Sequence, residues 1–276
     1  MISYTLQNEL KNKYSPEGSE LRFLQNNLLI LLQYFDKLCK DNNINYWLSS
    51  GSCLGAVRHK GFIPWDDDID VEMLREDYLK FEKIFKANED FVLQTYRNDL
   101  YYTEPFAKLR LRKTFVDEGR LTPLYKNKGI FLDIFVMERS NKFIASLCHL
   151  ILGSLRHLSY RFNTPSYLSD ILFAFLKRMS FGVVNCMRAF SCFSNKNKLR
   201  HTIGTGVVKN IRVKSELFPL KEILFEGRLY PVPGNTDSYL RRIFGNYMEI
   251  PKTIHTHSLK KIEFLSESDY DKLKEM

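Results

Sequence analysis

The feature that most constrains the fold of this chain is a run of acidic residues inside an apolar segment. Residues 61–73 read GFIPWDDDIDVEM, so four carboxylates fall within five positions. Asp68 and Asp70 alternate there with Ile69 and Val71, which is the period of a strand with one buried face. A solvent-exposed strand end is the plainest explanation of acidic residues, but half-buried carboxylates without a partner are costly. The segment therefore predicts a strand that holds a cation.

A divalent metal ion is the simplest partner for these carboxylates. On an extended strand Asp66, Asp68 and Asp70 share one side, and Asp67 points to the other. Carboxylates held this close repel one another unless a cation lies between them. Mg²⁺ prefers oxygen ligands and is usually held by one or two carboxylates together with substrate phosphates. We therefore predict Mg²⁺, or Mn²⁺, at Asp66, Asp68 and Asp70.

A glycine turn just before this strand is suited to binding an anion. Residues 44–48 have strand composition, SSGS follows them, and CLGAVRH can begin a helix. A glycine turn that opens a helix presents backbone N–H groups, here around Gly51, and Ser52 adds a hydroxyl donor. We expect this turn to hold phosphate groups.

Further candidate site residues lie on both sides of the acidic strand. Asp133 is a lone acidic residue in the apolar run GIFLDIFVM. It serves in this prediction as a third acidic element, although a buried partner of an arginine is the alternative. The cations that could meet phosphate oxygens are Arg58, His59, Lys60, Lys108 and Arg110.

The periodicity of the chain predicts an α+β fold with a mixed sheet and flanking helices. Helical spacing marks residues 17–41, with Ser15 or Ser19 as the N-cap, and residues 75–88; short strands are expected in the runs FVLQTY, PFAKLRL, TFVDE and GIFLDIFVM. Two long helical stretches follow, at 143–162 and 167–190. A hairpin turning at Glu226 and Gly227 and a helix closed by Gly245 come last. We divide the chain into a catalytic core at 1–140, a basic and mostly helical segment at 141–214, and a hairpin and helix at 215–276 that complete the catalytic domain.

The charge and composition of residues 141–214 suggest contact with a membrane. The net charge is +9, and residues 141–214 hold twelve Lys or Arg against one acidic residue. Because this segment is also rich in Leu, Ile and Phe, it suggests peripheral contact with an anionic membrane through cations such as Lys177, Arg178 and Arg188. A soluble helical subdomain is the equal alternative. No apolar run reaches the roughly 20 residues that span a bilayer, no leader peptide is legible, and nucleic acid is not an expected partner.

The cysteines and the N-terminus favour the cytoplasm as the location. Five cysteines, an odd number without paired C-x-x-C spacing, predict free or buried thiols: Cys39, Cys53, Cys148, Cys186 and Cys192. Neither disulfides nor a zinc site are expected from this pattern. The protein is therefore expected in the cytoplasm, and peripheral contact would place it on the inner face of the cell membrane.

The acidic segment and its surroundings resemble a known family. Residues 46–81, YWLSSGSCLGAVRHKGFIPWDDDIDVEMLREDYLKF, are similar to the signature of the LicD family, the phosphorylcholine-type transferases related to fukutin-like ribitol-phosphate transferases. The segments FAKLR, KGIFLDIFVM and VPGNTDSYLRRIFGNYMEIP resemble its later blocks, so the likeness runs from about residue 21 to 251. Two positions depart from the pattern: Leu111, where the family often has an acidic residue, and Phe244, where a Tyr usually precedes the glycine.

The resemblance implies a nucleotidyltransferase-like fold and a phosphotransferase activity. It implies that the Gly51–Ser52 turn and the Asp68 and Asp70 pair serve a CDP-linked donor and its Mg²⁺. The reaction implied is transfer of a phospho-substituent, such as phosphocholine, to a hydroxyl of a cell-surface glycan, as in lipopolysaccharide or teichoic acid, with Asp133 as a further ligand or as the base.

Three alternatives remain open from the sequence. The first is a nucleotidyltransferase that uses an NTP and releases pyrophosphate. The second is a sugar-nucleotide glycosyltransferase, although such enzymes usually place a longer nucleotide-binding region before their D-x-D motif. The third is a non-catalytic protein on the same scaffold that binds polyanions or membranes.

Overall fold

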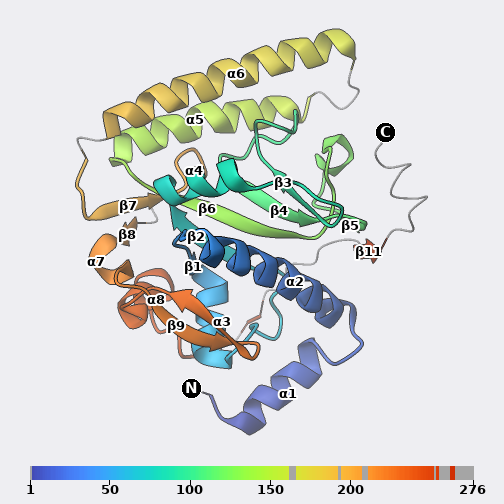
Figure 1. The fold of residues 1–276 in the computed structure, drawn as a ribbon, viewed down its shortest axis with the longest axis vertical. Coiled ribbons are helices and arrows are strands. Elements are labelled where there is room, and N and C mark those ends of the chain that lie inside the picture. The colour runs from blue at the N-terminus through green and yellow to red at the C-terminus, as the bar shows by residue number, and fades with distance from the viewer. Residues whose placement is uncertain are drawn as a thin grey trace.

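The centre of the molecule is a mixed sheet, flanked by helices. A computed structural model describes residues 2–161, 166–191, 194–206, 211–251, 253–254 and 262–264 (Figure 1). Among these residues the sheet has seven strands, ordered β1-β2-β6-β4-β3, with β7 paired to β6 and β8 to β7. The strands are β1 (Trp47–Leu48), β2 (Asp70–Leu74), β3 (Phe91–Gln94), β4 (Ala107–Leu111), β6 (Phe131–Arg139), β7 (Lys198–His201) and β8 (Ile211–Val213). Since β2 and β6 run parallel and the other pairs antiparallel, the predicted α+β class with a mixed sheet is confirmed.

One face of the sheet is covered by two helices, α2 (Glu20–Asp41) and α4 (Arg75–Ile84). The helix predicted at 17–41 begins where one of the two expected caps lies, because the Ser19 hydroxyl accepts the Arg22 N–H. Phe35 of α2 packs on Phe81 of α4, with ring centroids 5.0 Å apart. Alternate residues of β6 complete this core: Leu132, Ile134 and Val136. The intervening residues of β6 therefore face the opposite side of the sheet, and Asp133 is among them.

A smaller layer lies below the sheet in Figure 1 and closes around the start of α3 (Ser50–His59). It contains α7 (Lys214–Leu217), the hairpin of β9 (Lys221–Phe225) and β10 (Arg228–Val232), and α8 (Thr236–Phe244). The hairpin turns at Glu226 and Gly227, and α8 ends at Gly245, both as predicted. Tyr230 and Tyr239 are buried in the same core as α2 and β6. Residues far apart in the sequence thus pack against α3.

Two long antiparallel helices, α5 (Lys142–Ser159) and α6 (Tyr167–Phe190), form the outer layer at the top of Figure 1. They match the two predicted helical stretches closely. A second core cluster joins them, through residues such as Cys148, Leu152 and Phe173, to the loop that contains Tyr101. The basic segment 141–214 also contributes β7 and β8 to the main sheet, which the sequence pattern did not reveal because these strands are short and half charged.

The remaining elements are peripheral. They are α1 (Tyr4–Tyr14), β5 (Thr114–Val116) paired with β11 (Ile262–Phe264), and the short 3₁₀ helix η1 (Thr122–Leu124). Four cysteines are free thiols, of which Cys186 alone in the described residues is exposed, and Cys192 lies outside the described residues. Within the described ranges, none of the helices combines the length and the apolar character that crossing a bilayer requires.

Candidate active site

The acidic residues lie in the loop that leads from α3 into β2, and only Asp70 belongs to the strand. A carboxylate oxygen from each of Asp66, Asp67 and Asp68 lies within 4.8 Å of the other two. The prediction that Asp67 points away from Asp66 and Asp68 is therefore wrong. Alternation of faces requires extended strand geometry, and here the strand begins only at Asp70.

Three neighbouring strands place polar side chains in one row, on the face of the sheet opposite α2 and α4. Asp70 on β2 pairs in register with Asp133 on β6, and Asp133 pairs with Lys108 on β4. Residues directly opposite in a ladder point to the same side, so these three side chains are neighbours. The Lys108 Nζ lies 3.3 Å from an Asp133 carboxylate oxygen and 2.7 Å from Glu118 Oε2. Asp133 therefore lies beside Asp70, and we name Asp66, Asp67, Asp68, Asp70 and Asp133 the acidic centre.

The carboxylates of this centre repel one another strongly. Burial, and then the charges of Asp68 and Asp67, raise the pKa of Asp66 well above its ordinary value. Burial, followed by the charges of Asp68 and Asp133, does the same to the pKa of Asp70. The pKa of Asp133 is raised to about 6, chiefly by burial, although Lys108 opposes the shift. A cluster of crowded oxygen donors with too little positive charge nearby fits a hard divalent cation such as Mg²⁺.

The start of α3 is fastened to the first residue of β2. The Ser49 N–H donates to the Asp70 carbonyl over 2.9 Å, and the Asp70 N–H donates to the Ser52 hydroxyl over 2.9 Å. The residues predicted as a glycine turn are the first turn of α3 itself, which begins at Ser50. A first turn leaves backbone N–H groups without an intrahelical partner, and such groups attract anions. The predicted phosphate-binding element thus stands beside the carboxylates.

Gly51 leaves room for the carboxylate of Asp66. A methyl group built at Gly51 would lie 3.1 Å from Asp66 Oδ2, tighter than ordinary van der Waals contact. A larger residue would have to push the acidic loop aside. The need for glycine here comes from this close approach and not from an unusual backbone angle.

Gly51→Ala should therefore lower activity by roughly tenfold, because a small displacement of groups that position a substrate is costly. Its matched control is Gly182→Ala in α6, where an added Cβ meets nothing within 4 Å. Alanine favours helix formation at both positions, so any loss of stability seen in Gly51→Ala but not in Gly182→Ala measures the cost of the close contact with Asp66. Steady-state kinetics for donor and acceptor make the comparison; equal activity of the two variants would count against a role for the Gly51 contact.

The cations predicted to bind the donor fall into two groups. Lys108 and Arg110 lie beside the acidic centre, where Arg110 Nε donates to Gln94 and Nη1 to the Gly129 carbonyl, and its remaining nitrogen pairs with Glu118. Lys108 and Asp133 were both predicted as site residues, and the structure shows them in direct contact. A donor contact for both cations stays a prediction.

The second group, at the end of α3, is tied to other parts of the chain. Arg58 is buried and donates to the carbonyls of Tyr247 and Glu249 over 2.9 and 3.0 Å. Burial, and then the Arg58 charge, lower the pKa of His59 to about 3, so its ring is neutral at physiological pH. Lys60 is exposed and closes the helix with a positive φ of 57°. The charge of Arg58 still lowers the pKa of Asp66. Arg58 is therefore close enough to the acidic residues to interact with them electrostatically.

Sequence reasoning missed a buried network centred on Glu72. Its carboxylate accepts from Arg212 Nη2 at 2.7 Å, from the Ser49 hydroxyl at 2.8 Å and from Trp47 Nε1 at 2.7 Å. Burial alone would raise the pKa of Glu72, but the neighbouring Arg212 guanidinium holds it below the ordinary value. The Tyr239 hydroxyl donates to the same carboxylate and accepts the Ser50 N–H at 3.1 Å. The network thereby holds the start of α3 in place from β8 and α8.

Comparison with known proteins agrees with this geometry. Residues 43–164 match the family described as "LicD/FKTN/FKRP, nucleotidyltransferase domain", a range that contains Gly51, the acidic loop and Asp133. This match confirms the predicted resemblance to the LicD family. Together with the similarity to a LicD cholinephosphotransferase, it supports the predicted phosphotransferase activity.

Individual proteins also resemble this chain in sequence. The chain is 28% identical over 244 residues to the "Lipopolysaccharide cholinephosphotransferase LicD" of Haemophilus influenzae, which covers 81% of this chain and 89% of that protein. It is 46% identical over 48 residues to the "Ribitol-5-phosphate transferase FKTN" of Mus musculus, covering 17% of this chain and 10% of that protein. An uncharacterized protein of Rickettsia prowazekii is 28% identical over 152 residues, or 48% of this chain and 56% of its own length. Relatedness to LicD therefore extends over most of the chain, whereas the likeness to the ribitol-phosphate transferase is local.

Proposed function

We propose that this protein transfers a phospho-substituent, phosphocholine or a similar group, from a CDP-linked donor to a hydroxyl of a cell-surface glycan, in a reaction that depends on Mg²⁺ or Mn²⁺. The observation that carries the proposal is the gathering of Asp66, Asp68, Asp70 and Asp133 beside the first turn of α3, within the range that matches the LicD family. The similarity to a lipopolysaccharide cholinephosphotransferase of Haemophilus influenzae supports a cell-surface glycan as the acceptor.

Two features of the site suit a diphosphate donor. The first turn of α3 offers backbone N–H groups to phosphate oxygens, and Lys108 adds a cation at the opposite edge of the acidic row. A divalent ion held by Asp68 and Asp70 would neutralise negative charge that develops on the leaving phosphate. In this arrangement the donor diphosphate lies between α3 and β4.

The chemistry is a substitution at the distal phosphorus of the donor. The acceptor oxygen forms a bond to this phosphorus while the bond to the bridging oxygen breaks, and CMP leaves with the electron pair of that bond. The acceptor hydroxyl gives up its proton to a base. Asp133 faces the same side as Asp70 and has a pKa raised to about 6, so its ionised form predominates at neutral pH and can accept a proton.

Asp133→Asn separates the two roles open to Asp133, base or metal ligand. If Asp133 is the base, the variant should lose at least about a hundredfold in kcat and keep its affinity for Mn²⁺, because the proton acceptor alone is lost. If Asp133 is a ligand, the affinity for Mn²⁺ should fall together with kcat. Titration calorimetry with Mn²⁺, set beside steady-state kinetics, distinguishes the outcomes. A variant with normal kcat and normal Mn²⁺ affinity would exclude both.

Product analysis tests the reaction type. The protein is incubated with Mg²⁺, an acceptor glycan and, in turn, a panel of CDP-alcohols and NTPs. Release of CMP from a CDP-alcohol, with no pyrophosphate from any NTP, is the expected result. Pyrophosphate release would indicate a nucleotidyltransferase that attacks the proximal phosphorus, and absence of both products across the panel would favour a protein that only binds.

We also propose a cytoplasmic location, with the protein peripheral on the inner face of the cell membrane. This part of the proposal rests on the uneven charge and on the expectation that the acceptor glycan is assembled at a membrane. It concerns the outer helices α5 and α6, not the acidic centre.

A further inference from the structure

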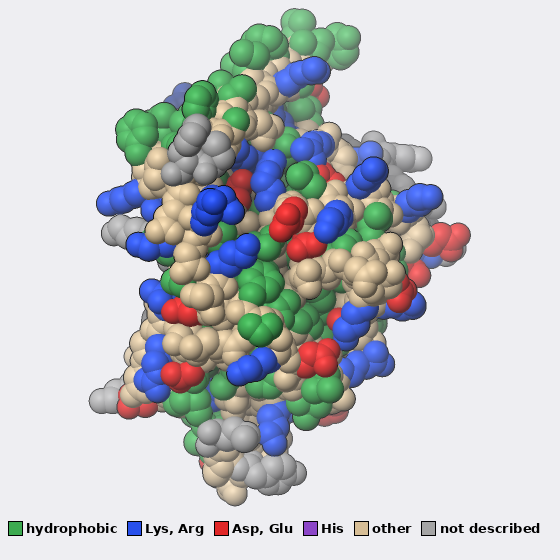
Figure 2. Space-filling model, turned by 60° about the vertical axis from the view of Figure 1, so that its left-hand side comes forward, with side chains coloured by type: hydrophobic (Ala, Val, Ile, Leu, Met, Phe, Trp, Pro, Cys, Tyr) green, Lys and Arg blue, Asp and Glu red, His purple; other side chains and the backbone are tan. Residues whose placement is uncertain are grey.

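The outer side of α6 is covered by large apolar side chains. Six of them recur at helical spacing and are each at least 45% exposed: Leu168, Ile171, Leu172, Phe175, Met179 and Val183. Spacings of three and four residues put them on one face, which we name the outer stripe of α6. In Figure 2 hydrophobic side chains gather along the top of the view, where the outer helices lie, and Lys and Arg side chains are frequent below them.

The opposite side of the same helix is also apolar, and it is buried in the protein. Phe173, Phe181 and Val184 are buried against α5 and the loop that contains Tyr101. A helix with large apolar side chains on two opposite faces is ordinarily covered on both of them. The outer stripe of α6 therefore requires an apolar partner outside the described part of the chain, and a continuous exposed patch of this kind marks an interaction surface.

The positive charge of the two outer helices favours an anionic membrane as this partner. Exposed cations lie on or at the end of the two outer helices, at Lys142, Arg161 and Arg178. The lone acidic residue of α5 and α6, Asp170, accepts a hydrogen bond from the Tyr101 hydroxyl. A second copy docked on the same face by a twofold axis would bring like charges together. An anionic bilayer surface instead attracts these cations while its acyl region accepts the stripe.

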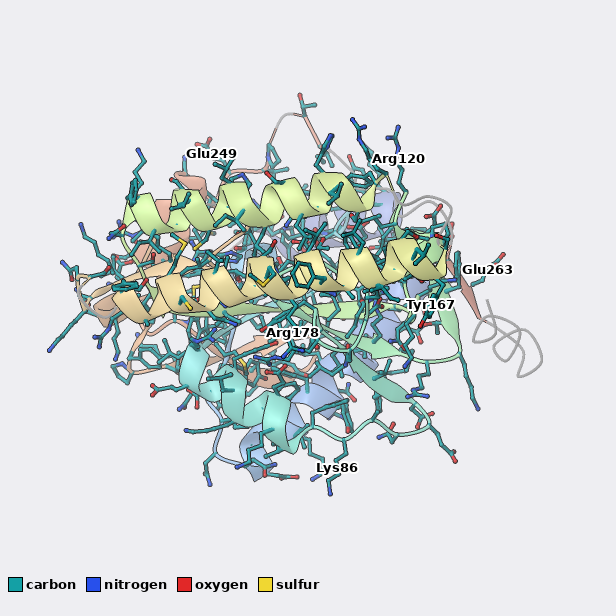
Figure 3. All side chains as sticks on the ribbon, turned by 90° about the horizontal axis from the view of Figure 1, so that it is seen from above. Lys86, Arg120, Tyr167, Arg178, Glu249 and Glu263 are labelled. Carbon is teal, nitrogen blue, oxygen red and sulfur yellow. The ribbon has the colours of Figure 1, made fainter. Side chains whose placement is uncertain are left out.

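The structure corrects which cations take part. Lys177 is buried, and its Nζ donates to the carbonyls of Asp99 and Leu100 over 2.6 and 2.7 Å. Arg188 pairs with Glu138 over 3.1 Å. These two side chains hold α6 on the body of the protein, so the expectation that they bind lipid headgroups is wrong. Arg178 is exposed and labelled beside α6 in Figure 3, which views the α5–α6 pair from outside.

We propose that the outer stripe of α6 lies in the headgroup region of an anionic bilayer, with α6 parallel to the membrane plane and Arg178 at the edge of the stripe. The proposal rests on the membrane location within the proposed function and identifies the surface responsible. It does not depend on the transfer chemistry, because the stripe is formed by other residues than the acidic centre.

Vesicle co-sedimentation tests the surface directly. The full chain is mixed with vesicles of phosphatidylcholine alone or with phosphatidylglycerol added, at increasing salt. Binding is expected to the anionic vesicles and to weaken as salt rises. Phe175→Glu should weaken this binding by at least about tenfold, because it places a negative charge in the stripe. Its matched control is Leu229→Glu on β10, the strand that pairs with β9 in the smaller layer below the sheet. The native Leu229 side chain is 53% exposed, compared with 59% for Phe175.

The outcomes are separable from the proposed reaction. Transfer to a water-soluble acceptor should be unchanged in Phe175→Glu, so failure of vesicle binding and failure of the chemistry are read independently. Absence of wild-type binding to anionic vesicles at low salt would overturn the proposal, as would equal binding by the two variants. A wild-type dimer in solution that Phe175→Glu dissociates would also overturn it, since a second copy would then cover the stripe.

Discussion

Asp70→Asn should lower transferase activity by at least about a hundredfold, since a group that supports the metal ion supplies several kcal/mol in the transition state and each tenfold in rate corresponds to about 1.4 kcal/mol. Asp70 is held rigidly, with its backbone N–H and carbonyl both bonded to the start of α3. Asparagine preserves the size of the side chain and these backbone contacts. The loss is therefore expected in kcat and in the response to Mg²⁺, not in folding.

The same variant should be more stable than the wild type when metal is absent. Burial and the charges of Asp68 and Asp133 raise the pKa of Asp70, so its ionised form destabilises the metal-free fold. Thermal unfolding should show a higher midpoint for Asp70→Asn without metal, and a smaller rise on adding Mg²⁺. Asp41→Asn in α2, an exposed carboxylate paired with Lys37, is the control and should change neither quantity appreciably. Near-normal turnover of Asp70→Asn with an unchanged Mg²⁺ response would rule out Asp70 as a ligand.

The parts of the site that are close in sequence were predictable from the sequence. A strand, a helix with Gly51 in its first turn, an acidic loop and a second strand follow one another within about thirty residues, and local periodicity indicates their order. Asp133 was also recognisable, because a single carboxylate in an otherwise apolar strand has few structural explanations. The register that sets Asp133 beside Asp70 required the structure, since strand pairing depends on contacts distant in sequence.

Predictions failed where burial or exact chain geometry decides the outcome. Asp67 was assigned to the wrong side because the alternation was applied from Asp66, whereas the strand begins only at Asp70. Lys177 was expected on a basic surface, but its ammonium group reaches loop carbonyls that a sequence pattern does not show. Likewise, Arg212 on the short strand β8 contacts Glu72, which lies 140 positions away in the sequence. Local sequence patterns do not predict such a contact.

Arg212→Ala should reduce the free energy of unfolding by about 3–5 kcal/mol, the range expected when one partner of a buried ion pair is removed. Both Arg212 and Glu72 are almost fully buried, and the change would leave the Glu72 carboxylate without its cation. His201 also lies beside Glu72, but in the wild type burial lowers its pKa to about 4, so it carries no charge near neutral pH. The pKa of Glu72 is below its ordinary value, so the pair stabilises the fold fully at pH 7 and the contribution is lost only as the pH falls through that lowered pKa. Urea unfolding at pH 7 measures the effect.

Arg242→Ala provides the matched control for this pair. Arg242 forms an ion pair with Glu216 at the surface, with 45% of its own side chain exposed, and exposed pairs contribute at most about 1 kcal/mol. The double variant Arg212→Ala/Glu72→Gln should recover part of the lost stability, because it removes the stranded charge. Activity should stay low in the double variant, since Glu72 also anchors Ser49 at the start of α3. If Arg212→Ala costs no more stability than Arg242→Ala, the Glu72 network does not hold α3 in the way described.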